Sequence, residues 1–138
     1  MTPSIIPYSN QYQTAVIDLW RQCNLTVPSN DPVEDIKKKT DFQPALFFIA
    51  LLFDQVIGSI MVGYEGHRGW INYLAVLPTF QKQGYGKLLI IKAVTELRKM
   101  GCVKVNLQIR PDNLQAIGFY QHLGFKQEER ISMSLRLV

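Results

Sequence analysis

The residues best suited to chemistry form a short segment, Gln81–Lys87, that contains two glycines and two lysines. It follows an apolar strand-like stretch and leads into a long helical pattern. Exposed N–H groups at a helix start attract anions, and the helix dipole adds to this attraction. Gly84 and Gly86 let the backbone approach a ligand closely, and Lys82 and Lys87 supply positive charge. The segment therefore predicts a cradle for a phosphate or pyrophosphate group.

Two widespread phosphate-binding motifs are excluded by the same residues. The segment lacks the Gly-Lys-Ser/Thr ending of a P-loop, and the G-x-G-x-x-G dinucleotide pattern is absent. Two glycines before a helix often form only a turn, so this segment alone leaves a purely structural role open.

A second motif, Asn113–Phe125, lies downstream of the glycine-containing loop. Gln81 to Gly86 fits Gln/Arg-x-x-Gly-x-Gly/Ala, and Asn113 to Phe125 fits Asn-x-x-Ala-x-x-Phe-Tyr-x-x-x-Gly-Phe. Together they resemble the GNAT superfamily of N-acetyltransferases, in the same order along the chain. Tyr120 alone would be interpreted as a core aromatic residue on a helix, whereas Asn113 seven residues earlier favours a functional role.

The resemblance implies acetyl-CoA as the acyl donor and assigns a role to each matching position. Backbone groups of one strand would bind the pantetheine arm and polarise the thioester carbonyl: Leu74, Ala75 and Val76. Backbone groups of the loop would hold the pyrophosphate: Gln81, Lys82, Gln83, Gly84, Tyr85, Gly86 and Lys87. Asn113 would contact the donor or brace the site, and Tyr120 would protonate the departing thiolate.

The chemistry requires such groups. A developing oxyanion needs a preorganised donor, and a thiol with a pKa near 8.5 is well matched to a phenol near 10. The attacking amine must be neutral, so a base or a water chain must take a proton. Bacterial ribosomal-protein N-terminal acetyltransferases, which the strand and loop Val105–Asn113 resemble, carry a Glu five residues before the Asn. Gln108 stands there in this chain and cannot serve as a base.

The acceptor side of the site rests on a closer resemblance, to the small bacterial YpeA-type acetyltransferases. The resemblance is carried by four segments: Leu19–Cys23, Pro28–Pro32, Asp35–Ile36 and Gly63–Gly69. In the GNAT fold the loop between the first two helices and the turn before the fourth strand lie beside the acceptor cleft. We therefore expect five residues to shape the acceptor site: Asn30, Asp31, Glu65, His67 and Arg68. Glu65 and His67 are also candidate bases, although a polar turn between two strands is the simpler interpretation of each residue by itself.

Hydrophobic periodicity and turn residues predict the order β-α-α-β-β-β-α-β-α-β-β. The first helix is expected to be capped by Asn10 and the second by Asn30 or Asp31. Strands are expected at 45–52, 56–64, 70–77 and 103–109, and again at Phe125 and Ile131–Leu137. The fold class is mixed α/β, and the resemblance implies a GNAT-like, mostly antiparallel sheet of six to seven strands with about four helices.

Composition bounds the remaining possibilities. The 138 residues, 47% hydrophobic and 19% charged, predict a single domain spanning 1–138. The net charge of +4 comes from scattered residues, which argues against specific nucleic-acid binding. No segment is long and apolar enough to predict a membrane span, and no metal site is expected. Cys23 and Cys102 are expected to be free thiols in a reducing cytoplasm.

These observations predict an enzyme that transfers acetyl from acetyl-CoA to a primary amine by direct attack in a ternary complex. The amine could belong to a small molecule, a peptide N-terminus or a lysine. The alternative is a non-catalytic acyl-CoA-binding sensor module, which the Gln at position 108 keeps open. The residues do not give the oligomeric state, and a homodimer stays open because dimers are common in the family that the chain resembles.

Overall fold

The computed structural model describes all residues, 1–138, and the chain divides into two compact units. The first unit is Met1–Leu107 and the second is Gln108–Val138.

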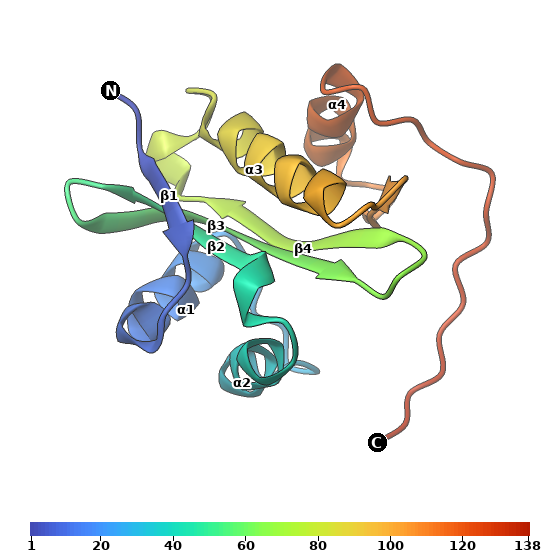
Figure 1. The fold of residues 1–138 in the computed structure, drawn as a ribbon, viewed down its shortest axis with the longest axis horizontal. Helices are drawn as coiled ribbons and strands as arrows, with labels where there is room; N and C mark the ends of the chain where they lie inside the picture. Colours follow the sequence, from blue (N-terminus) through green and yellow to red (C-terminus); the bar gives the residue numbers. More distant parts are fainter. The chain divides into compact units, whose positions relative to one another are not determined.

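The first unit is built on one sheet (Figure 1). Its strands are β1 (Ser4–Pro7), β2 (Phe47–Leu52), β3 (Gln55–Tyr64), β4 (Gly69–Val76) and β5 (Val105–Asn106). They lie in sequence order, with three antiparallel pairs followed by one parallel pair. A parallel pair needs a crossover connection, and the helix between β4 and β5 supplies it.

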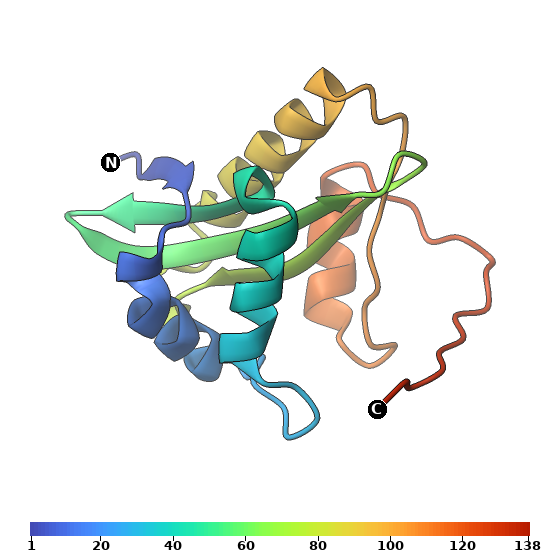
Figure 2. The same cartoon turned by 60° about the horizontal axis from the view of Figure 1, so that its bottom comes forward.

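Three helices of the first unit cover the two faces of this sheet. They are α1 (Gln13–Gln22), α2 (Pro32–Phe42) and α3 (Tyr85–Lys99). Helix α3 packs on one face, and α1 and α2 lie on the other (Figures 1 and 2). Apolar side chains with almost no exposure fill both layers, among them Trp20, Phe47, Leu89 and Leu97. Burial of these side chains is the main driving force for the fold.

Local signals account for most of these elements. Asp31 caps α2, as expected, by accepting bonds from the N–H groups of Val33 and Glu34 at 3.0 and 3.4 Å. The tight turn between β2 and β3 is formed by Phe53 and Asp54, both with positive φ. The expected cap at Asn10 is wrong. A 3-10 turn, Asn10–Tyr12, begins there instead, and α1 starts after it without a side-chain cap.

The second unit contains α4 (Leu114–His122) and no strand. The expected strands at Phe125 and Ile131–Leu137 are absent, so the sheet has five strands rather than six to seven. Residues 131–137 do alternate apolar and polar, but their apolar side chains are 84–90% exposed. Alternation does not by itself make a strand, because a strand requires a neighbour to complete its hydrogen bonds. The expected strand 103–109 is likewise reduced to Val105–Asn106.

Candidate functional site

Helix α3 begins in a way that leaves its first N–H groups available. Its N-cap residue, Gly84, has φ of 87°, and no side chain caps the helix. The first turn contains no acidic residue. Lys82, two residues earlier, also has a positive φ of 63°. The start of α3 therefore combines free donors, the positive end of a dipole and a nearby ammonium group, which suits an anion.

The loop before α3 has open space beside its backbone at Gly84 and is held to the end of β4 by Gln81. A Cβ added at Gly84 would meet no heavy atom within 4 Å, so a ligand can approach the main chain there. The Gln81 side chain donates to the carbonyl of Val76 at 2.9 Å and ties the loop to the end of β4. The Tyr85 side chain is buried, so this residue can offer only its backbone to a ligand.

Strand β4 pairs with β3 along one edge, and only its first residues pair with β5 along the other edge. β5 pairs with Gly69 and Trp70, and no strand pairs with β4 beyond that point on the same edge. Leu74, Ala75 and Val76 lie in this later part of the strand. An unpaired edge presents backbone donors and acceptors that an extended chain with amide groups can match. The three residues expected to bind the pantetheine arm thus lie on the part of β4 that β5 does not pair with, although the Val76 carbonyl already accepts from Gln81 and Cys23.

β4 also contains a bulge that sequence patterns did not indicate. Ser59 and Met61 of β3 pair with Ala75 and Asn72, so Tyr73 and Leu74 together face a single residue of β3. Tyr73 has φ of 51°, a conformation that tyrosine rarely adopts. Tyr73 fits the alternation of a strand in the sequence, and no local signal marks it. Bulges occur next to active sites because they redirect the backbone.

The Tyr73 side chain joins the bulge to helix α2. Its hydroxyl donates to Oδ2 of Asp35 at 2.6 Å. Burial and the adjacent Asp35 carboxylate raise the pKa of Tyr73 well above its usual range, and a hydrogen bond with the Asn30 side chain opposes this shift. Asn30 was expected on the acceptor side, whereas Asp35 was missed. The structure brings both to the bulge.

The remaining acceptor candidates have partners in their own segments. Glu65 Oε1 accepts from the backbone N–H groups of His67 and Arg68, and Arg68 donates to the carbonyl of His67. These bonds shape the exposed turn between β3 and β4. Asp31 is exposed and occupied with capping α2. Glu65, Arg68 and Asp31 thus have structural roles for their side chains, whereas His67 contributes its backbone, and the part of all four in acceptor binding stays a prediction.

The second unit carries the other expected site residues. The Oδ1 atom of Asn113 accepts from the N–H of Ala116 at 3.1 Å, so Asn113 caps α4. Tyr120 is buried on α4 and its ring lies edge-on to those of Phe119 and Phe125. Burial raises the pKa of Tyr120 to about 12. Gln108 donates to the hydroxyl of Ser132.

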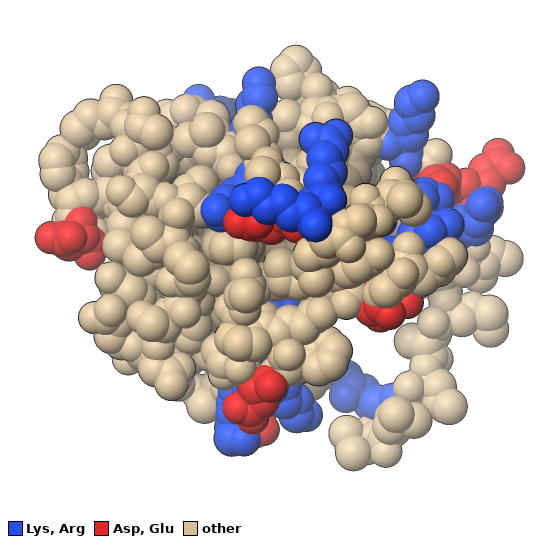
Figure 3. Space-filling model, in the orientation of Figure 1, with Lys and Arg blue, Asp and Glu red and all other residues tan.

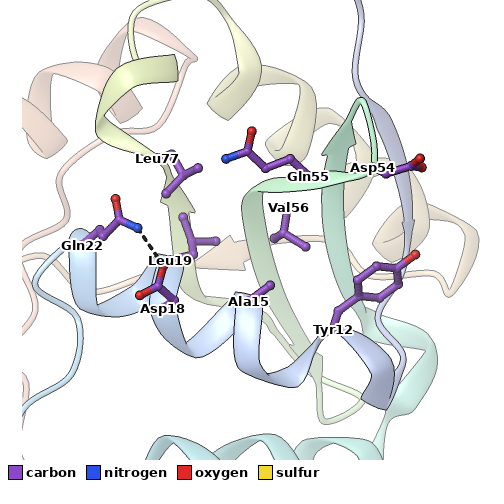
Figure 4. Close-up of a pocket in the computed structure, with 9 residues that line it drawn as sticks. All are labelled: Tyr12, Ala15, Asp18, Leu19, Gln22, Asp54, Gln55, Val56 and Leu77. Carbon is purple, nitrogen blue, oxygen red and sulfur yellow. Dashed lines mark hydrogen bonds between the residues drawn. The ribbon is translucent and has the colours of Figure 1, made fainter.

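A hollow of about 220 Å³ lies beside α1, the β2–β3 turn and the end of β4 (Figure 4). It is lined by Tyr12, Ala15, Asp18, Leu19, Gln22, Asp54, Gln55, Val56 and Leu77. None of these was expected in the site, and within it Gln22 donates to Asp18 at 2.8 Å. The hollow is therefore separate from the start of α3.

The charged surface does not form one basic tract. On the face in Figure 3, acidic side chains lie among the basic ones. On α3, Glu96 pairs with Lys92 at 3.0 Å and with Lys99 at 3.4 Å. No group of three or more His, Cys, Asp or Glu side chains is arranged to hold a metal ion. None of the helices combines the length and the apolar character that crossing a bilayer requires.

Comparison with known proteins identifies relatives along most of the chain. A family model described as "Acetyltransferase (GNAT) family" matches residues 14–125. An acetyltransferase of Yersinia enterocolitica is 40% identical over 123 residues, covering 89% of this chain and 87% of the relative. One from Pectobacterium atrosepticum is 40% identical over 124 residues, covering 90% and 88%.

Solved structures share the fold at lower identity. The aminoglycoside N-acetyltransferase AAC(6')-Iy, bound to a CoA-containing bisubstrate analogue, matches with a TM-score of 0.82 at 19% identity, covering all of both chains. A chain of the NatC complex, solved with Gag peptide and CoA, has a TM-score of 0.81 at 24% identity, covering 95% of this chain and 89% of that one. The ribosomal-protein-S18-alanine N-acetyltransferase of Escherichia coli reaches 0.79 at 20%, covering 91% and 79%.

Proposed function

The chain belongs to the acetyltransferase (GNAT) family, and we propose that it acetylates a primary amine by direct attack within a ternary complex. It is an N-acetyltransferase that uses acetyl-CoA as its donor. What remains to be proposed is which residues of this chain carry the reaction and which amine is the acceptor.

The observation that carries the proposal is the uncapped start of α3 next to the unpaired part of β4. Gly84 leaves the first-turn N–H groups of α3 open, and Gln81 ties the same loop to Val76. If the loop binds the pyrophosphate of a ligand, the arm attached to that pyrophosphate would therefore lie along the unpaired edge of β4. This arrangement suits a long ligand that has an anionic centre and an amide-containing arm.

Each part of this arrangement has a chemical task. Acetyl-CoA, when bound, supplies a thioester carbonyl that an amine can attack. The backbone around Leu74 to Val76 would hold the arm, and an N–H there would polarise the carbonyl where negative charge develops. Backbone groups from Gln81 to Lys87 would hold the pyrophosphate. The dipole of α3 strengthens that contact without placing a side chain in the way.

Tyr120 is the proposed proton donor to the leaving sulfur. Its pKa, raised to about 12 by burial, keeps the phenol protonated throughout the neutral range. A thiolate whose thiol has a pKa near 8.5 is a weaker base than this phenolate, so a full transfer is uphill. The phenol would therefore stabilise the developing thiolate by hydrogen bonding and deliver its proton as solvent re-enters. Asn113 would brace the site through α4, because its side chain caps that helix.

The amine acceptor is proposed to enter beside the α1–α2 loop and the β3–β4 turn. Two observations support this placement. The Tyr73 hydroxyl donates to Asp35 of α2, and the Asn30 side chain lies close enough to Tyr73 to lower its pKa, so that loop lies beside the bulge of β4. His67 and Glu65 remain the proposed proton acceptors, with Asn30, Asp31 and Arg68 shaping the entrance. The structural neighbours act on different amines, including an aminoglycoside and a ribosomal-protein alanine, so the shared fold does not select among them.

A test of the acceptor side must separate charge from helix capping. Asp31→Asn retains an oxygen that can cap α2 and removes only the charge. We expect Asp31→Asn and His67→Ala to change turnover of the amine more than affinity for acetyl-CoA. Unchanged kinetics in both variants would remove these residues from the acceptor site.

A non-catalytic acyl-CoA-binding module is the second candidate, because Gln108 carries an amide where related enzymes have a carboxylate base. One experiment separates the two functions. Acetyl-CoA and desulfo-CoA are titrated into the protein by calorimetry, and thiol release is then followed with small amines, peptides and lysine derivatives. Binding with turnover that falls in Tyr120→Phe supports the enzyme. Binding without turnover across all three acceptor classes supports the module.

We also propose that the protein is cytoplasmic and that it forms a homodimer. Cys23 and Cys102 are free thiols, which is consistent with a reducing cytoplasm. The homodimer is proposed because dimers are common in this family, and analytical ultracentrifugation of the purified chain would measure its oligomeric state.

A further inference from the structure

Ser59 is a fully buried polar residue in the middle of the sheet. Its hydroxyl takes part in two hydrogen bonds that join distant parts of the chain. The indole N–H of Trp20 donates to Ser59 Oγ at 2.9 Å, and Ser59 Oγ donates to the backbone carbonyl of Tyr73 at 2.9 Å. A buried hydroxyl with both bonds made is well determined in position, because breaking either bond leaves a polar group unsatisfied.

The second of these bonds is made to the residue that forms the bulge of β4. Tyr73 holds its left-handed conformation through three contacts. Its ring stacks on Trp20 at 3.8 Å, its hydroxyl donates to Asp35, and its carbonyl accepts from Ser59. A tyrosine with positive φ is unfavourable by itself and persists only where its surroundings enforce it. The network formed by Trp20, Ser59, Tyr73 and Asp35 enforces it here.

The geometry of one peptide bond connects this network to the donor site. The carbonyl of Tyr73 and the N–H of Leu74 belong to the same peptide group, which is trans. In a trans peptide these two groups point in roughly opposite directions. Because Ser59 holds the carbonyl, the N–H of Leu74 is directed away from Ser59. Leu74 is one of the residues expected to contact the thioester end of the donor.

We propose that Ser59, itself positioned by Trp20, is a positioning residue that aims the backbone N–H of Leu74 at the thioester carbonyl. This inference rests on the proposed acetyl transfer and specifies how one donor of that site is built. Ser59 does not touch the substrate. It acts through the peptide group between Tyr73 and Leu74, so its removal should affect the reacting carbonyl more than the binding of the rest of acetyl-CoA.

The test compares Ser59→Ala with Val62→Ala. Val62 is a buried neighbour on β3, and its truncation destabilises the core without touching the network. Removing an oxyanion donor costs about 100- to 1,000-fold in kcat, so misdirecting one should cost about 10- to 100-fold. We expect that loss in Ser59→Ala with KM for acetyl-CoA within about threefold, and no such loss in Val62→Ala. Ser59→Cys, which keeps the volume and a weaker hydrogen bond, should be intermediate.

A second measurement does not depend on turnover. In protein labelled with 15N-leucine, the amide resonance of Leu74 should differ between the acetyl-CoA and CoA complexes, because only acetyl-CoA has a thioester carbonyl. Ser59→Ala should abolish that difference. Equal losses of kcat in Ser59→Ala and Val62→Ala, or an unchanged Leu74 response in Ser59→Ala, would overturn the inference.

The same labelled samples separate this inference from the proposed function. If the parent protein acetylates no amine, the proposed function fails. A Leu74 response to the acetyl group that requires Ser59 would still support the positioning role, and the absence of any such response in the parent would overturn it.

Discussion

Asp31 caps helix α2 with its carboxylate, whereas helix α3 begins at Gly84 with no side-chain cap. Both helix starts have backbone N–H groups without intrahelical partners. At α2 the Asp31 oxygen takes up two of them, those of Val33 and Glu34. At α3 they are left to the surroundings. A capped start contributes stability, and an uncapped one is free to bind an anion, so the comparison contrasts a structural terminus with the terminus that we propose binds the donor.

The largest effect is expected from placing a carboxylate at the open terminus. Gly84→Asp puts negative charge where the pyrophosphate should lie, and repulsion between charges about 4 Å apart can cost several kcal/mol near a surface. We expect acetyl-CoA affinity to fall at least about 100-fold, as measured by calorimetry.

A matched control for that variant lies at the other end of the same helix. Gly101 has φ of 84° against 87° for Gly84, and both positions have open space for a Cβ. An aspartate near the C-terminus of α3 is unfavourable for the dipole, so Gly101→Asp should destabilise at least as much. Acetyl-CoA affinity equal in the two variants would contradict the assignment of the open terminus as the donor site.

A smaller effect is expected when only a methyl group is added. Gly84→Ala introduces no charge, but alanine at positive φ is strained by about 1–2 kcal/mol. The loop should shift to relieve that strain, and we expect acetyl-CoA affinity to fall about tenfold. Unchanged affinity together with lowered thermal stability would show that the backbone conformation at Gly84 does not matter for binding.

The lysine in the first turn of α3 should contribute less than the backbone. Lys87 is exposed, and an exposed charge is screened by salt. We expect Lys87→Gln to weaken acetyl-CoA binding about threefold at low salt, with the difference disappearing as salt is added. A loss as large as that of Gly84→Asp would make the side chain, rather than the helix start, the main anion contact.

At the capped terminus no effect on the donor is expected. Asp31→Ala removes the cap of α2 and should lower the free energy of unfolding by about 1 kcal/mol, measured by urea denaturation. Asp31→Asn should restore most of it. Acetyl-CoA affinity should remain that of the parent in both variants, and a marked loss in either would erase the distinction between the two helix starts.

Local patterns predicted most elements of the first unit, and they failed where the formation of a strand depends on a partner strand. The cap at Asp31 and the long helix α3 each follow from a few adjacent residues. The strand at 131–137 was predicted from equally clear alternation, yet it is absent because a strand also needs a partner. The expected site residues show the same division. Gly84 and Asn113 lie at the starts of α3 and α4, as their motifs predicted, and their part in binding stays a prediction. The contacts of Asp35 and Ser59 with Tyr73 were not predicted.

The sequence by itself determined the family resemblance and indicated the candidate anion-binding loop and the candidate proton donor, because each is contained in a short motif. The tertiary structure decided how β4 presents its backbone. Trp20 and Ser59 are separated by 39 residues, and Ser59 and Tyr73 by 14. In the sequence Ser59 is a small polar residue in an apolar strand, and nothing beside it indicates a partner. Only folding brings the indole, the hydroxyl and the carbonyl within hydrogen-bonding distance, because their contact depends on the packing of α1 against the sheet and not on local spacing.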